Sequence, residues 1–407
     1  MFEVKSVNDV IEIIDHNFSG YQLEDESVGI EDAVGRIATA DLTANEDIPG
    51  FNRSSVDGYA VISSDTFGAS ESLPAQLNLI GEVKMGEKPL FSLKTGQAAY
   101  VPTGGELPEN ADAVVMLEYT ENFNDGFIYM NKSSAPGNHV VFKGDDVRTG
   151  DVVIKAGTCL RPQDVGAIAA MGYVSVPVKR KIRVGIISTG DEIIDVNEKP
   201  VGAQVRDTNA YALHAGLINF GAQPKLYGIV NDNFDNIKQA VEKALIHSDV
   251  VLISGGSSVG ARDETYKVID SLGSPGILVH GIAVKPGKPT ILGSVSGKAV
   301  IGLPGHPASA YIIFNFFVGH LLNIINGRKE EFKPGLRAEM AINYPSNNGR
   351  EEYLPVKLES VNGKLYAHPV FGKSGLISML ASANGYVHIS RGSEGINKGS
   401  EVDVVLL

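Results

Sequence analysis

The alternation of apolar strand candidates with helix candidates between Lys181 and Gly327 constrains the fold more than any other feature of the sequence. The runs RVGIIS, KLYGIV and VVLISGG are almost continuously apolar, and each is followed by a segment with helical spacing. Such runs indicate strands that are buried on both faces, as in parallel sheets, whereas a half-exposed strand alternates apolar and polar residues. The sequence therefore predicts a central, mainly parallel, three-layer α/β/α domain.

The same segment contains the other elements of that domain. Helices are expected in NAYALHAGLINFG, NFDNIKQAVEKALIHSD, DETYKVIDSLG and PASAYIIFNFFVGHLLNIIN, and further strands in ILVHGIAV, PTILG and AVIGLPG. Gly221 is the predicted end of the first helix. The last helix is the most apolar stretch of the chain, but it contains Asn315, Gly319 and His320, which favours a buried helix over a membrane span.

The flanking segments have different patterns. Residues 6–17 have apolar positions at helical spacing behind Ser6, a good N-cap residue. Short alternating runs dominate from about residue 45 to residue 146 and again after Gly327, where they suggest a small barrel or sandwich. We therefore predict four parts: a connecting domain (1–45 and 147–178), an inserted β-rich domain (46–146), the α/β domain (179–327) and a C-terminal β domain (328–407).

Composition narrows the class of function. The chain has 407 residues, which is more than one core usually holds, and a net charge of −13 from 35 basic and 48 acidic residues. A general nucleic-acid binder would normally have a basic surface, so none is expected here. The single cysteine, Cys159, and a start without a basic and apolar signal peptide are typical of a cytoplasmic enzyme.

Three loops follow strand candidates of the α/β segment, at residues 188–192, 254–260 and 303–307. In doubly wound domains ligands bind beyond the carboxyl ends of the strands, where backbone N–H groups can contact an anion. Turns alone could explain each loop, but three in one array favour a phosphate-binding rim. Neither a G-x-G-x-x-G motif nor a P-loop is present. The candidate residues are Ser188, Thr189, Gly190, Glu192, Ser254, Gly255, Gly256, Gly260, Pro304 and Pro307.

Cations near these loops are candidates for binding an anion. Lys285 and Lys288 flank a Pro-Gly pair between two strand candidates, a turn that could aim both ammonium groups at one anion. The alternative is a solvated hairpin with two exposed lysines. Arg262, beside the second loop, is a further candidate for a phosphate contact.

Several carboxylates lie in loops that could serve one site. Each one alone is usually a turn residue or a helix cap. A hard cation such as Mg²⁺ requires oxygen ligands and would be expected beside phosphates. Several acidic loops around one site could supply those ligands. The candidates are Asp57, Asp146, Glu192, Asp207 and Asp263.

Taken together, these segments resemble the MoeA family, the molybdopterin molybdenumtransferases. The matching text, in this order, is FNRSSVDGYAV, VPTGGELPENADAVVMLE, FKGDDV, IRVGIISTGDEI, RDTNAYAL, SGGSSVGARDETYKV, AVKPGKPTILG and IGLPGHPASA. The resemblance covers practically the whole chain. It implies a C-terminal β-barrel, a homodimer, and a Mg²⁺-dependent reaction of adenylyl-molybdopterin with molybdate that yields molybdenum cofactor and AMP.

The resemblance also implies roles for individual residues. Catalytic roles are expected for Asp57, Asp146, Asp207, Asp263, Lys285 and Lys288. Glu192, Asp207 and Asp263 are the expected metal ligands. Thr103, Arg262, Ser374 and the loop residues named above are expected to bind substrate. Two positions depart from the family pattern, because His306 replaces its usual Asn and Ser257 its usual Val.

Three other functions have to be weighed. The first is a molybdopterin adenylyltransferase, but such an enzyme would resemble residues 181–327 only. An adenylyltransferase is, however, a possible contact partner of this chain. A nucleotide-linked hydrolase could be built on the same α/β domain, and gephyrin-like chains act as scaffolds for receptor tails. The additional N- and C-terminal segments favour metal transfer, without distinguishing molybdate from tungstate.

Overall fold

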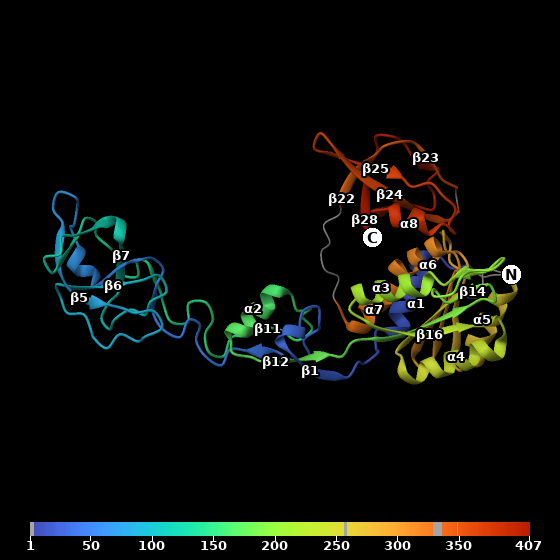
Figure 1. Ribbon diagram of the computed structural model, residues 1–407, viewed down its shortest axis with the longest axis horizontal. Helices are drawn as coiled ribbons and strands as arrows, with labels where there is room; N and C mark the ends of the chain where they lie inside the picture. Colours follow the sequence, from blue (N-terminus) through green and yellow to red (C-terminus); the bar gives the residue numbers. More distant parts are fainter. Residues whose placement is uncertain (1–3, 256–258, 329–335, 348) are drawn as a thin grey trace. The chain divides into compact units, whose positions relative to one another are not determined.

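The computed structural model describes residues 4–255, 259–328, 336–347 and 349–407, with the backbone alone for residues 259–263 (Figure 1). The chain forms two compact units. One comprises residues 1–26, 35–37 and 177–407, and the other comprises residues 27–34 and 38–176. The two-unit grouping does not test the boundaries of the four predicted parts, which stay predictions.

A six-stranded sheet forms the centre of the first unit. Its strands, in spatial order, are β16 (Gln223–Val230), β13 (Arg183–Thr189), β17 (Val250–Gly255), β21 (Lys298–Leu303), β20 (Ile291–Val295) and β18 (Pro275–His280). The first four pair in parallel, and β20 runs antiparallel to both of its neighbours. The prediction of a mainly parallel sheet is confirmed.

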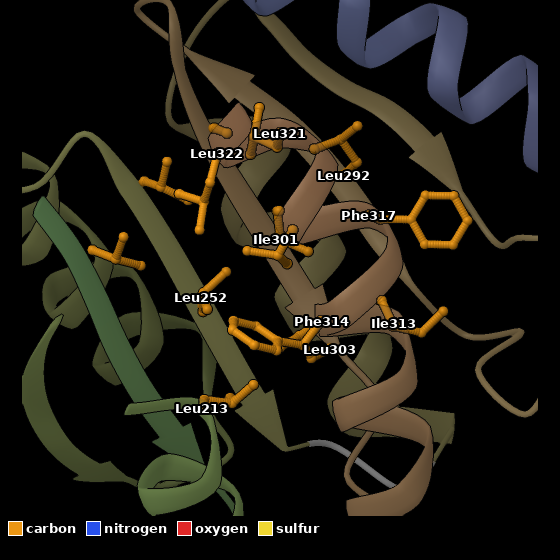
Figure 2. Close-up of a cluster of buried hydrophobic side chains, with 14 of the residues drawn as sticks. Leu213, Leu252, Leu292, Ile301, Leu303, Ile313, Phe314, Phe317, Leu321 and Leu322 are labelled. Carbon is orange, nitrogen blue, oxygen red and sulfur yellow. The ribbon is translucent and has the colours of Figure 1, made fainter. Parts of the chain in front are cut away.

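Helices cover both faces of this sheet. One face packs against α1 (Val7–Phe18), α3 (Asn209–Asn219) and the segment Pro307–Asn326, and the other against α4 (Phe234–His247) and α5 (Val259–Ser271). Successive residues of β17 serve opposite layers: Leu252 contacts the first core and Ile253 the second. Figure 2 shows Leu252 and Ile301 of the sheet facing Phe314. The three-layer α/β/α prediction is confirmed.

The long apolar helix belongs to this core. It consists of α6 (Pro307–Ile313), a π-helical turn (Phe314–Val318) and α7 (Gly319–Asn326). Its length and composition would allow it to cross a membrane, but most of its apolar stretch is buried inside the protein. Phe314, Phe317 and Leu321 contact the sheet and the neighbouring helices (Figure 2). The segment is therefore a core helix, as predicted.

The C-terminal segment closes into a barrel. Its five strands are β22 (Leu336–Met340), β24 (Glu351–Val361), β25 (Lys364–Pro369), β26 (Gly385–Ile389) and β28 (Glu401–Leu406). The ring closes because β24 pairs with both β25 and β26. Met340, Val356 and Val387 are among the buried residues of its interior. The alternating pattern of this segment predicted either a barrel or a sandwich, and the structure is a barrel.

The second unit is mainly β, as the alternation of residues 46–146 predicts. Its largest sheet contains, in order, β7 (Ala113–Met116), β4 (Gly58–Val61), β6 (Gln97–Val101), β5 (Ala75–Glu82), β9 (Phe127–Met130) and β8 (Thr120–Asn122). Its other elements include the short strands β3 (Arg53–Ser54) and β11 (Val152–Ile154) and the helix α2 (Pro162–Ala170). Strand β12 (Ser175–Lys179) begins in this unit and ends in the first.

Two predicted elements differ from the structure. Helix α5 begins at Val259, so the end of the predicted loop at residues 254–260 is the first turn of a helix. The expected strand ILVHGIAV is interrupted, because Gly281 has a φ of +98° and turns the chain after β18. The residues Val284–Lys285 form a separate strand, β19, which pairs with β24 of the barrel.

Phe314 is fully buried in the first core, which makes its truncation a test of the packing. We expect Phe314→Ala to lower the free energy of unfolding by about 3–5 kcal/mol, because it removes buried apolar surface and leaves a cavity. Urea unfolding followed by far-UV circular dichroism measures the change. Phe371→Ala is the control, since Phe371 is 66% exposed and its removal should change stability little.

Candidate active site

A cavity of about 480 Å³ lies at the carboxyl ends of the parallel strands. The three predicted strand-end loops all contribute to its lining, through Glu192, Gly255 and the residues Gly305, His306 and Pro307. Arg206, Asp207, Thr208 and Asn209 form another side, and Gly375 and Ile377 of the C-terminal segment complete it. Loops far apart in the sequence therefore meet around one cavity, within one unit of the chain.

A short parallel ribbon brings Asp207 to this cavity. Strand β14 (Ile193–Ile194) pairs with β15 (Val205–Arg206), and the Asp207 N–H donates to the Ile194 carbonyl over 3.0 Å. The buried Ser188 hydroxyl donates to one Asp207 carboxylate oxygen. The Ala210 N–H, in the first turn of α3, donates to the other oxygen over 3.0 Å. Asp207 thus caps α3 and fixes the first loop at the same time.

The first and second loops approach each other very closely. Thr189 pairs with Gly255 at the ends of β13 and β17. A Cβ atom on Gly255, whose φ is +151°, would lie 1.9 Å from the Thr189 carbonyl oxygen. Only glycine can occupy this position without moving the backbone. The predicted residue Gly255 is therefore required for the geometry of the cavity wall.

Asp232, which sequence reasoning missed, lies beside the first loop. It accepts a hydrogen bond from the buried Thr189 hydroxyl. Burial raises the pKa of Asp232, and the charges of Glu192 and Asp191 raise it further, although the Thr189 hydrogen bond acts in the opposite direction. The available signal was positional, because Asp232 follows the strand KLYGIV just as the predicted loops follow their strands.

Asn209 is a second residue that the sequence analysis missed. Its amide nitrogen donates to the Ser254 hydroxyl and to the Gly305 carbonyl, over 2.9 Å in each case. One buried side chain therefore connects α3, the second loop and the third loop. Its place in the RDTN motif, two residues after Asp207, was the signal that could have identified it.

The third loop contacts the C-terminal domain. Nδ1 of His306 lies 2.8 Å from the Ser374 hydroxyl oxygen, and the Ala308 N–H donates to the Ser374 carbonyl over 3.1 Å. Pro304 is buried, and Pro307 is the first residue of α6. Ser374, predicted from the resemblance, is thus placed beside a residue that lines the cavity.

The two lysines of the KPGK turn have different environments. The Nζ atom of Lys285 lies 2.8 Å from a carboxylate oxygen of Glu352, which is buried and also accepts from Tyr344 and Ser346. Burial opposes ionisation of Glu352, but Lys285 and the two hydroxyls outweigh it and lower its pKa. Lys288 is exposed and has no side-chain partner among the described residues. Only Lys288 therefore has an uncompensated charge.

The predicted residues of the second unit form their own group. The Asp57 carboxylate accepts from the Thr103 N–H over 2.8 Å and from the Thr103 hydroxyl over 3.1 Å. Both residues are exposed, next to β4 and β6. Asp146 is exposed in the same unit and takes no part in these two hydrogen bonds. The structure brings Asp57 and Thr103 together, and the catalytic role of Asp57 and the substrate-binding role of Thr103 stay predictions.

Metal ligation can be examined only where side chains are described. No cluster of three or more His, Cys, Asp or Glu side chains suited to a metal is present in the described part of the chain. Of the three predicted ligands, Glu192 and Asp207 both line the cavity. Gly256 lies outside the described residues, as do the side chains of Arg262 and Asp263, and Gly260 is described by its backbone only.

Fold and cavity together define a class: a multi-domain α/β protein with a cavity at the carboxyl ends of a parallel sheet, lined in part by a C-terminal segment. Family models match three consecutive parts of the chain. They are the MoeA N-terminal region (domain I and II) at residues 5–172, a probable molybdopterin binding domain at residues 185–323, and the MoeA C-terminal region (domain IV) at residues 337–407.

Individual relatives agree with these models. The molybdopterin molybdenumtransferase of Bacillus subtilis is 32% identical over 390 residues, which cover 95% of this chain and 90% of the relative. Two crystal structures of MoeA proteins from Pyrococcus horikoshii match with TM-scores of 0.83 and 0.85 at 38% and 34% identity, and they cover 99% and 100% of both chains. The chain belongs to the MoeA family, as its motifs indicated.

The raised pKa of Asp232 has a consequence for stability. A carboxyl group whose pKa is higher in the folded state than its unfolded value of about 3.8 stabilises the fold below that value. This contribution is lost as the pH rises through the folded pKa. We expect Asp232→Asn to increase the free energy of unfolding at neutral pH and to weaken its decrease as the pH rises from the acidic range.

Urea unfolding of both proteins at a series of pH values measures this difference. Asp235→Asn is the control, because Asp235 is an exposed residue in the first turn of α4. Removing its favourable interaction with the helix dipole should leave stability unchanged or slightly lower. Identical pH profiles for Asp232→Asn and the native chain would contradict the expectation.

Proposed function

We propose that this chain inserts molybdenum from molybdate into adenylyl-molybdopterin and releases AMP, as a step of molybdenum cofactor biosynthesis. The observation that carries the proposal is the cavity lined by residues between 192 and 209, by Gly255 and by residues 305–307. All of these lie in the segment matched by the molybdopterin-binding family model. Relatives that align over nearly the whole chain are named molybdopterin molybdenumtransferases.

The charges around the cavity support a substrate that arrives with a divalent cation. Two carboxylates, Glu192 and Asp207, line it, whereas Arg206 is the one Arg or Lys of its described lining. The Arg206 guanidinium already donates to the carbonyls of Val196 and Glu198. A phosphate-bearing ligand in such a place would be repelled by the carboxylates unless a cation neutralised part of the charge.

The residues present fit Mg²⁺. This ion is commonly bound through one or two carboxylates together with substrate phosphates and water. Each Asp207 oxygen already accepts one hydrogen bond, so Glu192, which is exposed, is the freer ligand. Glu192 and Asp207 would hold the ion, which would neutralise phosphate charge in the adenylyl linkage.

Three further properties belong to the same proposal. The family resemblance supports a homodimer and contact with a molybdopterin adenylyltransferase that supplies the adenylylated substrate. The composition, with one cysteine and a net charge of −13, supports a cytoplasmic enzyme without nucleic-acid or membrane ligands.

Incubation of the native chain with adenylyl-molybdopterin, Mg²⁺ and molybdate tests the proposed reaction. We expect AMP to be released together with active cofactor, and release to fall when Mg²⁺ is removed with a chelator. Tungstate in place of molybdate tests the preference for the metal oxyanion. Absence of AMP release under all these conditions would rule out metal transfer.

Two carboxylates test the site within this reaction. We expect Asp57→Ala and Asp263→Ala each to lower the rate of AMP release by about 100-fold or more, because each removes a carboxylate to which the family resemblance assigns a catalytic role. Far-UV circular dichroism should be unchanged. Asp403→Ala is the control, since Asp403 is an exposed barrel residue with a side chain 76% exposed. Normal rates for both site variants would refute the assignment.

A further inference from the structure

His306 and Ser374 form a hydrogen-bonded pair at the wall of the cavity. His306 immediately precedes α6, at the end of the third loop, and its exposed side chain lines the cavity. Ser374 comes from the segment between β25 and β26, and its neighbour Gly375 lines the same cavity. The pair therefore connects the α/β domain to the C-terminal domain at the place where a ligand would bind.

The chemistry of this pair is set by the two nitrogens of the imidazole ring. Nδ1 contacts the Ser374 hydroxyl at 2.8 Å, and Nε2 has no partner among the described residues. A neutral imidazole carries its proton on one nitrogen only. If the Ser374 O–H donates to Nδ1, the proton is on Nε2, which can then donate to a ligand.

An anionic ligand favours the tautomer that carries its proton on Nε2. Phosphate oxygens only accept hydrogen bonds, so a Nε2 lone pair facing them would be repelled, whereas a Nε2–H group would bind them. Two donors close to the cavity are already engaged. The Ala210 N–H of α3 donates to Asp207, and the Arg206 Nε–H donates to backbone carbonyls. His306 Nε2, in contrast, belongs to a residue of the cavity lining and has no partner among the described residues.

We propose that His306 is a substrate-positioning residue, and that the Ser374 hydroxyl fixes its ring as the Nε2–H tautomer so that it donates to a phosphate oxygen of the bound ligand. The inference rests on the proposed function for the class of ligand, a phosphate-bearing nucleotide conjugate. Ser374 acts through His306, since its hydroxyl proton is directed to Nδ1. The position matters because the resemblance leads one to expect Asn where this chain has His306.

The tautomer can be observed directly. Histidine labelled with ¹⁵N reports which ring nitrogen is protonated in a long-range ¹H–¹⁵N spectrum, recorded at about pH 9, where histidine is ordinarily neutral. The signals of His306 are those lost in His306→Phe, which keeps a planar ring without nitrogens. We expect the Nε2–H form in the native chain with AMP bound, and a mixture of both forms in Ser374→Ala. An Nδ1–H form in the AMP complex would overturn the proposal.

Binding of AMP, measured by calorimetry with Mg²⁺ present, tests the role in positioning. We expect the dissociation constant to rise roughly tenfold in His306→Phe and roughly fivefold in Ser374→Ala, and to return to the native value in Ser374→Thr. In the transferase assay KM should rise while kcat stays within about twofold, since the contact is made equally before and during reaction. His247→Asn, at the exposed end of α4, is the control.

The double variant His306→Phe/Ser374→Ala separates an indirect role of Ser374 from a direct one. If Ser374 acts through His306, the double variant binds AMP as weakly as His306→Phe alone. Additive losses of AMP affinity would show that Ser374 contacts the ligand itself and would overturn the proposal. Unchanged AMP affinity in both single variants would also overturn it, as would a native chain that does not bind AMP. A failure of the proposed molybdenum transfer can be told apart from a failure of this proposal, because the spectra and the calorimetry require no turnover.

Discussion

The parallel pairing of β13 with β17, continued as far as Thr189 and Gly255, determines where this protein can bind a ligand. Both faces of the sheet are covered by helices, so the strand ends are the places where backbone and small side chains reach a cavity. The absence of a Cβ atom at Gly255 allows the first two loops to touch. Asn209 then adds the third loop through its hydrogen bonds to Ser254 and Gly305.

Much of the fold could be predicted because buried faces of helices and strands place apolar residues at regular intervals in the sequence. The Ser6 cap and the apolar spacing behind it identified α1, and the strands of the central sheet were visible as apolar runs. The prediction failed where a distant partner decides the structure. Val284 and Lys285 do not continue β18, because Gly281 turns the chain after that strand. They pair instead with β24, more than 60 residues later in the sequence. The π-helical turn at Phe314–Val318 leaves no periodic signal either.

The candidate site was predictable in part for the same reason. Loops at the ends of buried strands could be identified because the position of a parallel strand fixes where its carboxyl end lies. Side chains that act through tertiary contacts could not. Glu352 is an example: it lies in a barrel strand with an ordinary alternating pattern, and only the folded chain places it against Lys285. Asp232 follows a strand of the same sheet, so the position of that strand in the sequence is a signal for it.

The distribution of charge follows from these contacts. The sequence suggested two lysines aimed at one anion, yet Glu352 neutralises Lys285 within a network that also includes Tyr344. If this turn attracts an oxyanion, as the sequence predicts, the charge available for it is that of the exposed Lys288. Within the cavity, carboxylates are balanced by few cations, so the anionic ligand that we propose would need a metal ion or neutral donors to bind there. A histidine with one nitrogen held by a hydroxyl group is such a donor, and its strength depends on a residue of another domain.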